Sequence, residues 1–185
     1  YNLDNTKKLP SFIKERLEAG GINSINPVVD ILNYVMLDLG QPMHAFDLNK
    51  IGKQINVRFA KSNEKIHLLD ESSKVLNDKC LVISDEKEPL AFAGIMRGIK
   101  SSVSATTNSV FIESAFFAPY IIRGKARNFN IQTDSSQRFE RGVDYNLQSL
   151  ALVKATNLIK EYLSGTYSKI STVENKSNLP RQRLI

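Results

Sequence analysis

The sequence has no tryptophan, a single cysteine and only two histidines among its 185 residues. The lone Cys80 excludes a disulfide scaffold, and no zinc site can be built from it with His44 and His67 at these spacings. No apolar run reaches the 18 residues or so that a membrane-spanning helix needs. The chain also lacks a glycine-rich phosphate loop and a G-x-S-x-G nucleophile motif. These absences argue against nucleotide-phosphate chemistry and against a serine hydrolase triad.

Hydrophobic residues make up 42% of the chain and charged residues 24%, as in an ordinary globular protein. Twenty-five basic residues against 19 acidic ones give a net charge of +6. This balance favours an acidic partner such as nucleic acid, although a lysine-rich surface composition alone would produce it too. The chain begins at Tyr1 without a signal-like apolar stretch, which suggests a piece of a larger intracellular chain. One domain is expected over residues 1–165, followed by a linker over 166–185 that leads into a further module.

Helical patterns flank a strand-rich middle, and this order predicts an α+β fold. Helices are predicted at Ser11–Ala19, Pro27–Leu39, Pro119–Arg127 and Leu147–Ser164. Strands are predicted at Ile55–Phe59, Lys65–Leu69, Leu81–Ser84, Leu90–Ala93 and Val110–Ser114. Ser11 and Asn26 are the expected N-caps, and Gly40 is expected to end the second helix. Val57 and Phe59 alternate with polar residues, which predicts a half-buried strand with these apolar side chains toward the core.

Two residues have settings that point to chemistry. His44 follows the apolar second helix in a proline-containing turn, where a rigid support can present a side chain to a pocket. Glu113 is the one carboxylate in the apolar run 110–117. A buried carboxylate must be paired, hydrogen-bonded or neutral, whereas a glutamate on the solvent face of an edge strand needs no partner. His67 has no acidic or cysteine partner at ligand spacing, so a structural role is favoured.

Basic residues cluster between positions 123 and 141. Arg123, Lys125 and Arg127 have no acidic neighbours in the sequence and are the candidate RNA phosphate contacts. Arg138 and Arg141 are interleaved with acidic residues at 134, 140 and 144, so they are expected to form ion pairs that fasten a loop.

Several long, irregular segments in this order resemble the beta subunit of bacterial phenylalanine–tRNA ligases. They are Ile25–Asp30, Asn33–Leu37, Gly40–Asp47, Glu113–Phe117 and Arg138–Asp144, and the resemblance covers roughly residues 9 to 165. The region resembled is the family's editing module. The resemblance implies a mixed α+β sheet layered with helices, a three-layer sandwich, that hydrolyses tyrosine wrongly esterified to tRNA(Phe). It also implies a cytoplasmic parent enzyme, an alpha2-beta2 assembly that charges tRNA(Phe) with phenylalanine. ATP and magnesium would serve its alpha subunit, and this module would need no cofactor or metal.

The resemblance also assigns roles to individual residues. Glu113 would read the tyrosine hydroxyl, and His44 would lie near the scissile ester. The remaining substrate-binding positions that it implies are Asn33, Gly94, Thr133 and Ser135, the last standing where the family usually has alanine.

The chain departs from the family at Leu32, usually threonine, and at Arg97, usually glycine. An inward Arg97 would fill the pocket or pair with Glu113, whereas an outward one would contact a phosphate of the tRNA. The alternative function is therefore the same domain with editing lost, retained as a structural and tRNA-supporting module. A free-standing deacylase is a further option.

Overall fold

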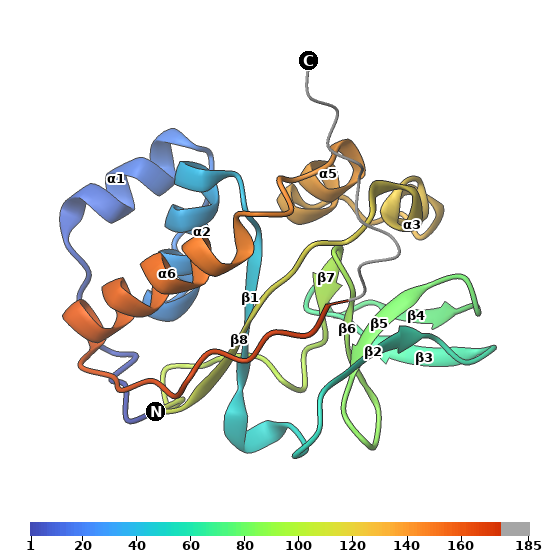
Figure 1. The fold of residues 1–185 in the computed structure, drawn as a ribbon, viewed down its shortest axis with the longest axis horizontal. Helices are drawn as coiled ribbons and strands as arrows, with labels where there is room; N and C mark the ends of the chain where they lie inside the picture. The colour runs from blue at the N-terminus through green and yellow to red at the C-terminus, as the bar shows by residue number, and fades with distance from the viewer. Residues whose placement is uncertain (175–185) are drawn as a thin grey trace.

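The computed structural model describes residues 1–174 and confirms the α+β fold (Figure 1). Its helices are α1 (Ser11–Ala19), α2 (Pro27–Leu39), the short 3-10 helix η1 (Leu48–Lys50), α3 (Pro119–Ile122), α4 (Lys125–Asn128), α5 (Asp134–Arg141) and α6 (Gln148–Leu163). Its strands are β1 (Met43–Asp47), β2 (Asn56–Phe59), β3 (Glu64–His67), β4 (Ser73–Leu76), β5 (Leu81–Ser84), β6 (Pro89–Phe92), β7 (Met96–Arg97) and β8 (Val110–Ser114). Among the described residues, no helix is long and apolar enough to cross a membrane.

The strands form three sheets in which all the described neighbours are antiparallel. The sheets have the orders β1-β8, β2-β5-β6-β7 and β3-β4, and a bridge between Leu68 and Gly98 joins the third to the segment after β7. The layered sheet implied by the resemblance is thus divided into separate ladders. The long β1-β8 ladder runs through the middle of the molecule (Figure 1).

Two hydrophobic cores lie on opposite sides of this ladder. Helices α1, α2 and α6 pack together on one side, with Ile13, Ile31 and Ala155 fully buried among them. On the other side, the second core holds Phe92 and Phe139 between the four-stranded sheet and the segment that contains α3, α4 and α5. Because β1 and β8 contribute side chains to both cores, their position is strongly constrained.

Helix α2 begins and ends as predicted. The Asn26 side chain accepts a hydrogen bond from the Val29 amide at 3.1 Å, and Gly40 ends the helix in the left-handed conformation. The prediction that Ser11 caps α1 is wrong, because Ser11 is already the first helical residue and Pro10 is the N-cap. The fixed φ of Pro10 directs the chain into the helix without a side-chain cap.

The predicted orientation of β2 is also wrong. Val57 and Phe59 are 59% and 54% exposed, and Arg58 between them points inward. The Arg58 guanidinium donates to both carboxylate oxygens of Glu64, at 2.7 and 2.8 Å. Successive side chains of a strand point to opposite faces, so this bidentate pair forces the two apolar neighbours outward.

The second half of the chain departs from prediction in its helices. The single helix predicted over 119–127 is two short helices, α3 and α4, separated by Gly124 at a φ of +75°. Helix α5 was not anticipated, because its sequence is mostly polar. Helix α6 ends one residue early, with Ser164 in the left-handed conformation. Residues 166–174 contain no helix or strand, and the rest of the predicted linker, 175–185, lies outside the described residues.

Candidate functional site

The β1-β8 register places His44 directly opposite Glu113. Directly opposed residues of an antiparallel pair have side chains on the same face, and His44 Nδ1 lies 3.0 Å from Glu113 Oε2. Each side chain is only 12% exposed. Glu113 is therefore a largely buried, partnered carboxylate and does not stand on a solvent face. His44 lies within β1, so its expected position in a turn is wrong.

The contact favours one tautomer of a neutral imidazole. An ionised carboxylate only accepts hydrogen bonds, so the Nδ1 of a neutral His44 carries the hydrogen and donates it to Glu113. The lone pair of the neutral ring is then on Nε2. A histidine oriented in this way by a carboxylate is equipped to accept a proton from a water molecule.

His44 lines a cavity of about 210 Å³. The cavity's walls come from the segment between α1 and α2, from α2 itself, and from β1, β7 and the start of α5. The lining residues are Ile22, Ile25, Val29, Leu32, Asn33, Met36, Met43, His44, Ala45, Leu69, Ile95, Met96, Arg97, Thr133, Asp134 and Ser135. The volume is below the roughly 300–1,000 Å³ of drug-sized pockets and suits a group no larger than an amino-acid side chain.

Four of the predicted site residues, Asn33, His44, Thr133 and Ser135, meet at this cavity. Thr133 is the N-cap of α5 and uses its hydroxyl twice. The hydroxyl accepts from the Ser136 amide at 3.0 Å and donates to the Ile95 carbonyl at 2.8 Å. It thereby ties the start of α5 to the loop before β7 and closes one wall of the cavity.

Two predicted site residues do not line the cavity. Glu113 contacts it only through His44. Gly94 has a φ of +69° and faces the second core, where a β-carbon would lie 3.1 Å from side-chain atoms of both Ile122 and Phe117. Gly94 therefore shapes the turn that places the Ile95 carbonyl beside Thr133.

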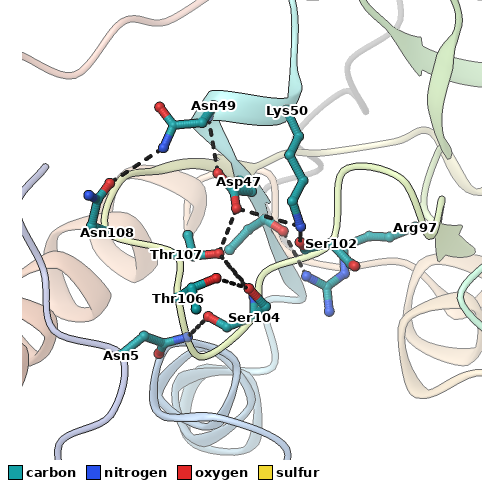
Figure 2. Close-up of polar contacts among 11 residues, drawn as sticks. Asn5, Asp47, Asn49, Lys50, Arg97, Ser102, Ser104, Thr106, Thr107 and Asn108 are labelled. Carbon is teal, nitrogen blue, oxygen red and sulfur yellow. Dashed lines mark hydrogen bonds and ion pairs between the residues drawn. The ribbon is translucent and has the colours of Figure 1, made fainter.

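Arg97 points into the protein and is only 9% exposed. Its Nη1 donates to the Ala45 carbonyl of β1 at 2.7 Å, which links β7 to the open edge of β1 (Figure 2). Burial lowers the pKa of the guanidinium, and the nearby Glu113 carboxylate opposes that shift. No ion pair joins Arg97 to Glu113 or to another acid within residues 1–174, so Arg97 faces inward without capturing the carboxylate.

A polar network holds the far end of β1 (Figure 2). The buried Asp47 carboxylate accepts hydrogen bonds from the Thr107 hydroxyl at 2.6 Å and from the backbone amide of Asn49 at 3.0 Å. Lys50 donates to the Ser102 carbonyl at 2.8 Å. These bonds fasten the 101–109 loop to the strand that carries His44.

Sequence reasoning missed most of the apolar cavity wall. Met36 and Met43 line it together with the backbone around Ala45 and Ile95. Helix α2 is apolar almost all round, and this pattern is the available signal, because such a helix must contact something on more than one side.

The basic residues proposed for RNA lie on α3 and α4 and the link between them. Arg123 and Arg127 are exposed and Lys125 is half-buried. An acid is nearby after all: the Glu140 carboxylate accepts from the Gly124 amide at 3.2 Å, and the Arg123 guanidinium reaches the Glu140 carbonyl at 3.5 Å.

Three further predictions concern structural contacts. The predicted pairing of Arg138 with Asp134 is confirmed at 2.8 Å, whereas Arg141 has no ion pair within residues 1–174, so that part of the prediction is wrong. His67 is exposed on β3 and bonds Ser73 Oγ at 2.9 Å, in keeping with a structural role. Within the described part of the chain, no three acidic, cysteine or histidine side chains lie close enough to hold a metal ion.

Residues 1–164 match the B3/4 domain family, and the chain belongs to that family. Its curated relatives include the phenylalanine–tRNA ligase beta subunit of Legionella pneumophila (strain Lens), 52% identical over 97% of this chain and 23% of the relative. The same subunit of Coxiella burnetii is 48% identical over 97% of this chain, and that of Acinetobacter baylyi 46% identical over all of it. The resemblance indicated by the sequence segments is thus confirmed.

This chain spans about a quarter of the length of those relatives. Among solved structures, an N-terminal fragment of the phenylalanyl-tRNA synthetase beta subunit from Pyrococcus horikoshii is similar, with 15% identity and a TM-score of 0.43. That likeness covers 70% of this chain and 40% of the fragment.

Proposed function

We propose that this chain is the editing module of a phenylalanine–tRNA ligase beta subunit and hydrolyses tyrosine wrongly esterified to tRNA(Phe). The observation that carries the proposal is the buried His44–Glu113 pair at the edge of a small, largely apolar cavity. The family and the names of the curated relatives support it.

Physical chemistry explains why such a module is needed. Tyrosine is phenylalanine plus one hydroxyl. An apolar pocket at the site that charges the tRNA rejects an added hydroxyl by only about 10²-fold. A second site that hydrogen-bonds that hydroxyl reverses the preference, because phenylalanine leaves the site's polar groups unpaired. Such a site can discriminate by roughly 10⁴- to 10⁵-fold.

In this proposal His44 positions the attacking water near the ester carbonyl. The Nδ1 contact with Glu113 holds the ring so that Nε2 can accept a hydrogen from that water. An aminoacyl ester is already reactive, so ordered positioning of the water supplies much of the acceleration. Glu113 lies behind His44 and does not itself line the cavity, but its second oxygen, Oε1, is not used in the His44 contact. We propose Oε1 as the acceptor of the tyrosine hydroxyl hydrogen, which requires the ring to reach past the imidazole.

The other predicted residues then form the substrate pocket and its approach. Asn33, Thr133 and Ser135 line the cavity that would hold the aminoacyl group. Arg123 and Arg127 would contact the tRNA backbone together with Lys125. Helix α5 connects the two regions, since it begins at the cavity and its Glu140 contacts Arg123. Eight helical residues span about 12 Å, so the basic residues lie about that far from the cavity along α5.

The parent enzyme would be a cytoplasmic synthetase in which this chain works beside an alpha subunit that uses ATP and magnesium. The module itself would bind tRNA(Phe) and would need no cofactor. Phenylalanine charging would belong to the rest of the assembly.

The test is deacylation of tyrosyl-tRNA(Phe) by the complete synthetase containing this chain. Glu113→Ala and His44→Ala should each lower the rate about 10²-fold or more, as expected for a positioned acid–base group. His67→Ala is the matched control, because that histidine lies outside this cavity and its side chain bonds only Ser73 among residues 1–174. Unchanged phenylalanine charging shows that the assembly is intact. Deacylation that survives both substitutions in an intact assembly excludes these roles.

A further inference from the structure

Arg97 lines the cavity with a largely buried side chain. The lining residues Ile25 and Leu69 are 64% and 38% exposed, so the cavity opens to solvent beside them, whereas Ala45 is fully buried and Arg97 is 9% exposed. The Arg97 backbone is bonded to Leu69, with the Leu69 amide donating to the Arg97 carbonyl at 3.0 Å, while the Arg97 side chain turns inward to Ala45. A cation is therefore held in a part of the cavity wall that is largely shielded from water. The Glu113 carboxylate is near enough to stabilise this charge electrostatically but forms no hydrogen bond with it. Burial of a charged group whose donors are unfilled is costly, so these donors call for a hydrogen-bond acceptor.

Most of the guanidinium's hydrogen-bonding capacity is unused. Nη1 bonds the Ala45 carbonyl, and neither Nε nor Nη2 has a partner among residues 1–174. In the same part of the chain, no fully buried side-chain nitrogen or oxygen lacks a hydrogen bond. Nε and Nη2 must therefore keep some accessible surface, and the cavity is the open space that Arg97 lines. These donors are available to a ligand.

The orientation of the ligand follows from its attachment. This step rests on the proposed editing function. The ester end of an aminoacyl-tRNA continues into the nucleic acid and must remain at the mouth, so the ring enters first. Its para position then lies among the more buried lining residues, where the Arg97 guanidinium is the basic group with unused donors.

We propose that Arg97 donates a hydrogen bond to the para oxygen of the tyrosyl ring and so helps to determine the specificity of this cavity. A phenol both donates and accepts hydrogen bonds. Glu113 can take only the hydroxyl hydrogen, and its Oε2 is already engaged with His44. Arg97 supplies the complementary donor to the oxygen lone pair. The site therefore selects a ring that presents an acceptor, and phenylalanine leaves the guanidinium unpaired.

The contributions of Glu113 and Arg97 to recognition of the para group can be separated with ring analogues of almost equal size. The 4-amino group of 4-aminophenylalanine offers two hydrogens and is a poor acceptor, whereas the tyrosine hydroxyl offers both functions. A site read by the carboxylate alone would bind the two about equally. A site read by Arg97 should prefer tyrosine by roughly 10- to 100-fold, the worth of one hydrogen bond to a charged group.

The experiment measures binding of adenosine that carries each amino acid through a non-hydrolysable 3′ amide to the 185-residue chain. Isothermal calorimetry should give the preference for tyrosine over 4-aminophenylalanine with the natural sequence. Arg97→Met should abolish it, whereas Arg97→Lys should retain part of it, because an ammonium still donates. Arg58→Met is the matched control: it removes a half-buried arginine outside the cavity and should leave the preference unchanged.

The outcomes distinguish the inference from the function on which it rests. Equal binding of the two analogues by the natural chain overturns the role of Arg97. So does a preference that survives Arg97→Met, or tighter tyrosyl binding once Arg97 is replaced by glycine, which would mean that the side chain merely obstructs the cavity. Hydrolysis is measured separately: a preference that depends on Arg97 without any deacylation supports the reading of the para oxygen and refutes the proposed esterase.

Discussion

Replacing Gly94 by alanine should be among the most destabilising small substitutions in this chain. The residue has a φ of +69°, and an added β-carbon would lie 3.1 Å from Ile122 Cδ1, 3.1 Å from Phe117 Cδ2 and 3.3 Å from Phe139 Cδ2. The left-handed backbone alone costs an alanine about 1–2 kcal/mol. Forcing a methyl group among three packed side chains adds roughly 1–3 kcal/mol.

These two costs can be measured apart. Gly21 has a φ of +71°, almost the same as that of Gly94, but a β-carbon there would have no atom within 4 Å. Gly21→Ala should therefore show only the backbone cost of about 1–2 kcal/mol. The difference between the two variants isolates the packing cost.

Urea and thermal unfolding of the 185-residue chain, followed by circular dichroism, would provide the numbers. A combined loss of about 2–5 kcal/mol at Gly94 corresponds to a fall in Tm of roughly 4–20 °C for a chain of this size. The fall at Gly21 should be roughly 2–8 °C. Equal losses at the two positions would show that the second core yields to the methyl group, and the close packing argued for Gly94 would be refuted.

Two further stability measurements follow from hydrogen bonds. The Arg58 guanidinium and, to a smaller extent, the Lys61 amide hold the pKa of Glu64 below its ordinary value of 4.5. A lowered pKa means that the ionised carboxylate contributes stability above pH 4.5 and loses it as the pH falls through the folded value. Glu64→Gln should therefore lower stability at pH 7 and flatten its decline below pH 4.5 in urea titrations; an unchanged acid slope would contradict the pairing. Asn26→Ala should cost about 1 kcal/mol by removing the cap on the Val29 amide, whereas Asn26→Ser should restore most of it, and equal Tm values for all three chains would argue against the cap.

Local signals predicted the elements whose ends are set by their own residues. Asn26 and Gly40 bound α2 because an N-cap and a left-handed glycine act within one turn of helix. The strand at Val110–Ser114 was also predicted with its full extent. Polar residues at 106–109 mark its start, whereas its apolar run continues to residue 117 beyond the end of the strand.

The orientation of β2 depends on a contact that local alternation does not contain. Apolar side chains at 57 and 59 ordinarily indicate the buried face of a strand. Here the inward position at 58 is occupied by an arginine whose partner, Glu64, lies on the next strand. The bidentate ion pair joins residues of two different sheets, so the alternation within 55–59 does not contain it.

The candidate site shows the same division between local and tertiary information. The sequence indicates that a carboxylate within an apolar strand needs a partner, but the partner lies 69 residues away and is set by register. A slip of one residue would place Glu113 opposite a neighbour of His44 and would turn one whole strand over, moving Phe111 out of the second core. The packing on both sides of the β1-β8 ladder therefore selects the register, and the His44–Glu113 contact is a consequence of that selection. Arg97 also depends on tertiary structure for its role. Its bond to Ala45 closes the outer edge of β1, and the remaining guanidinium donors stay beside the cavity that His44 lines.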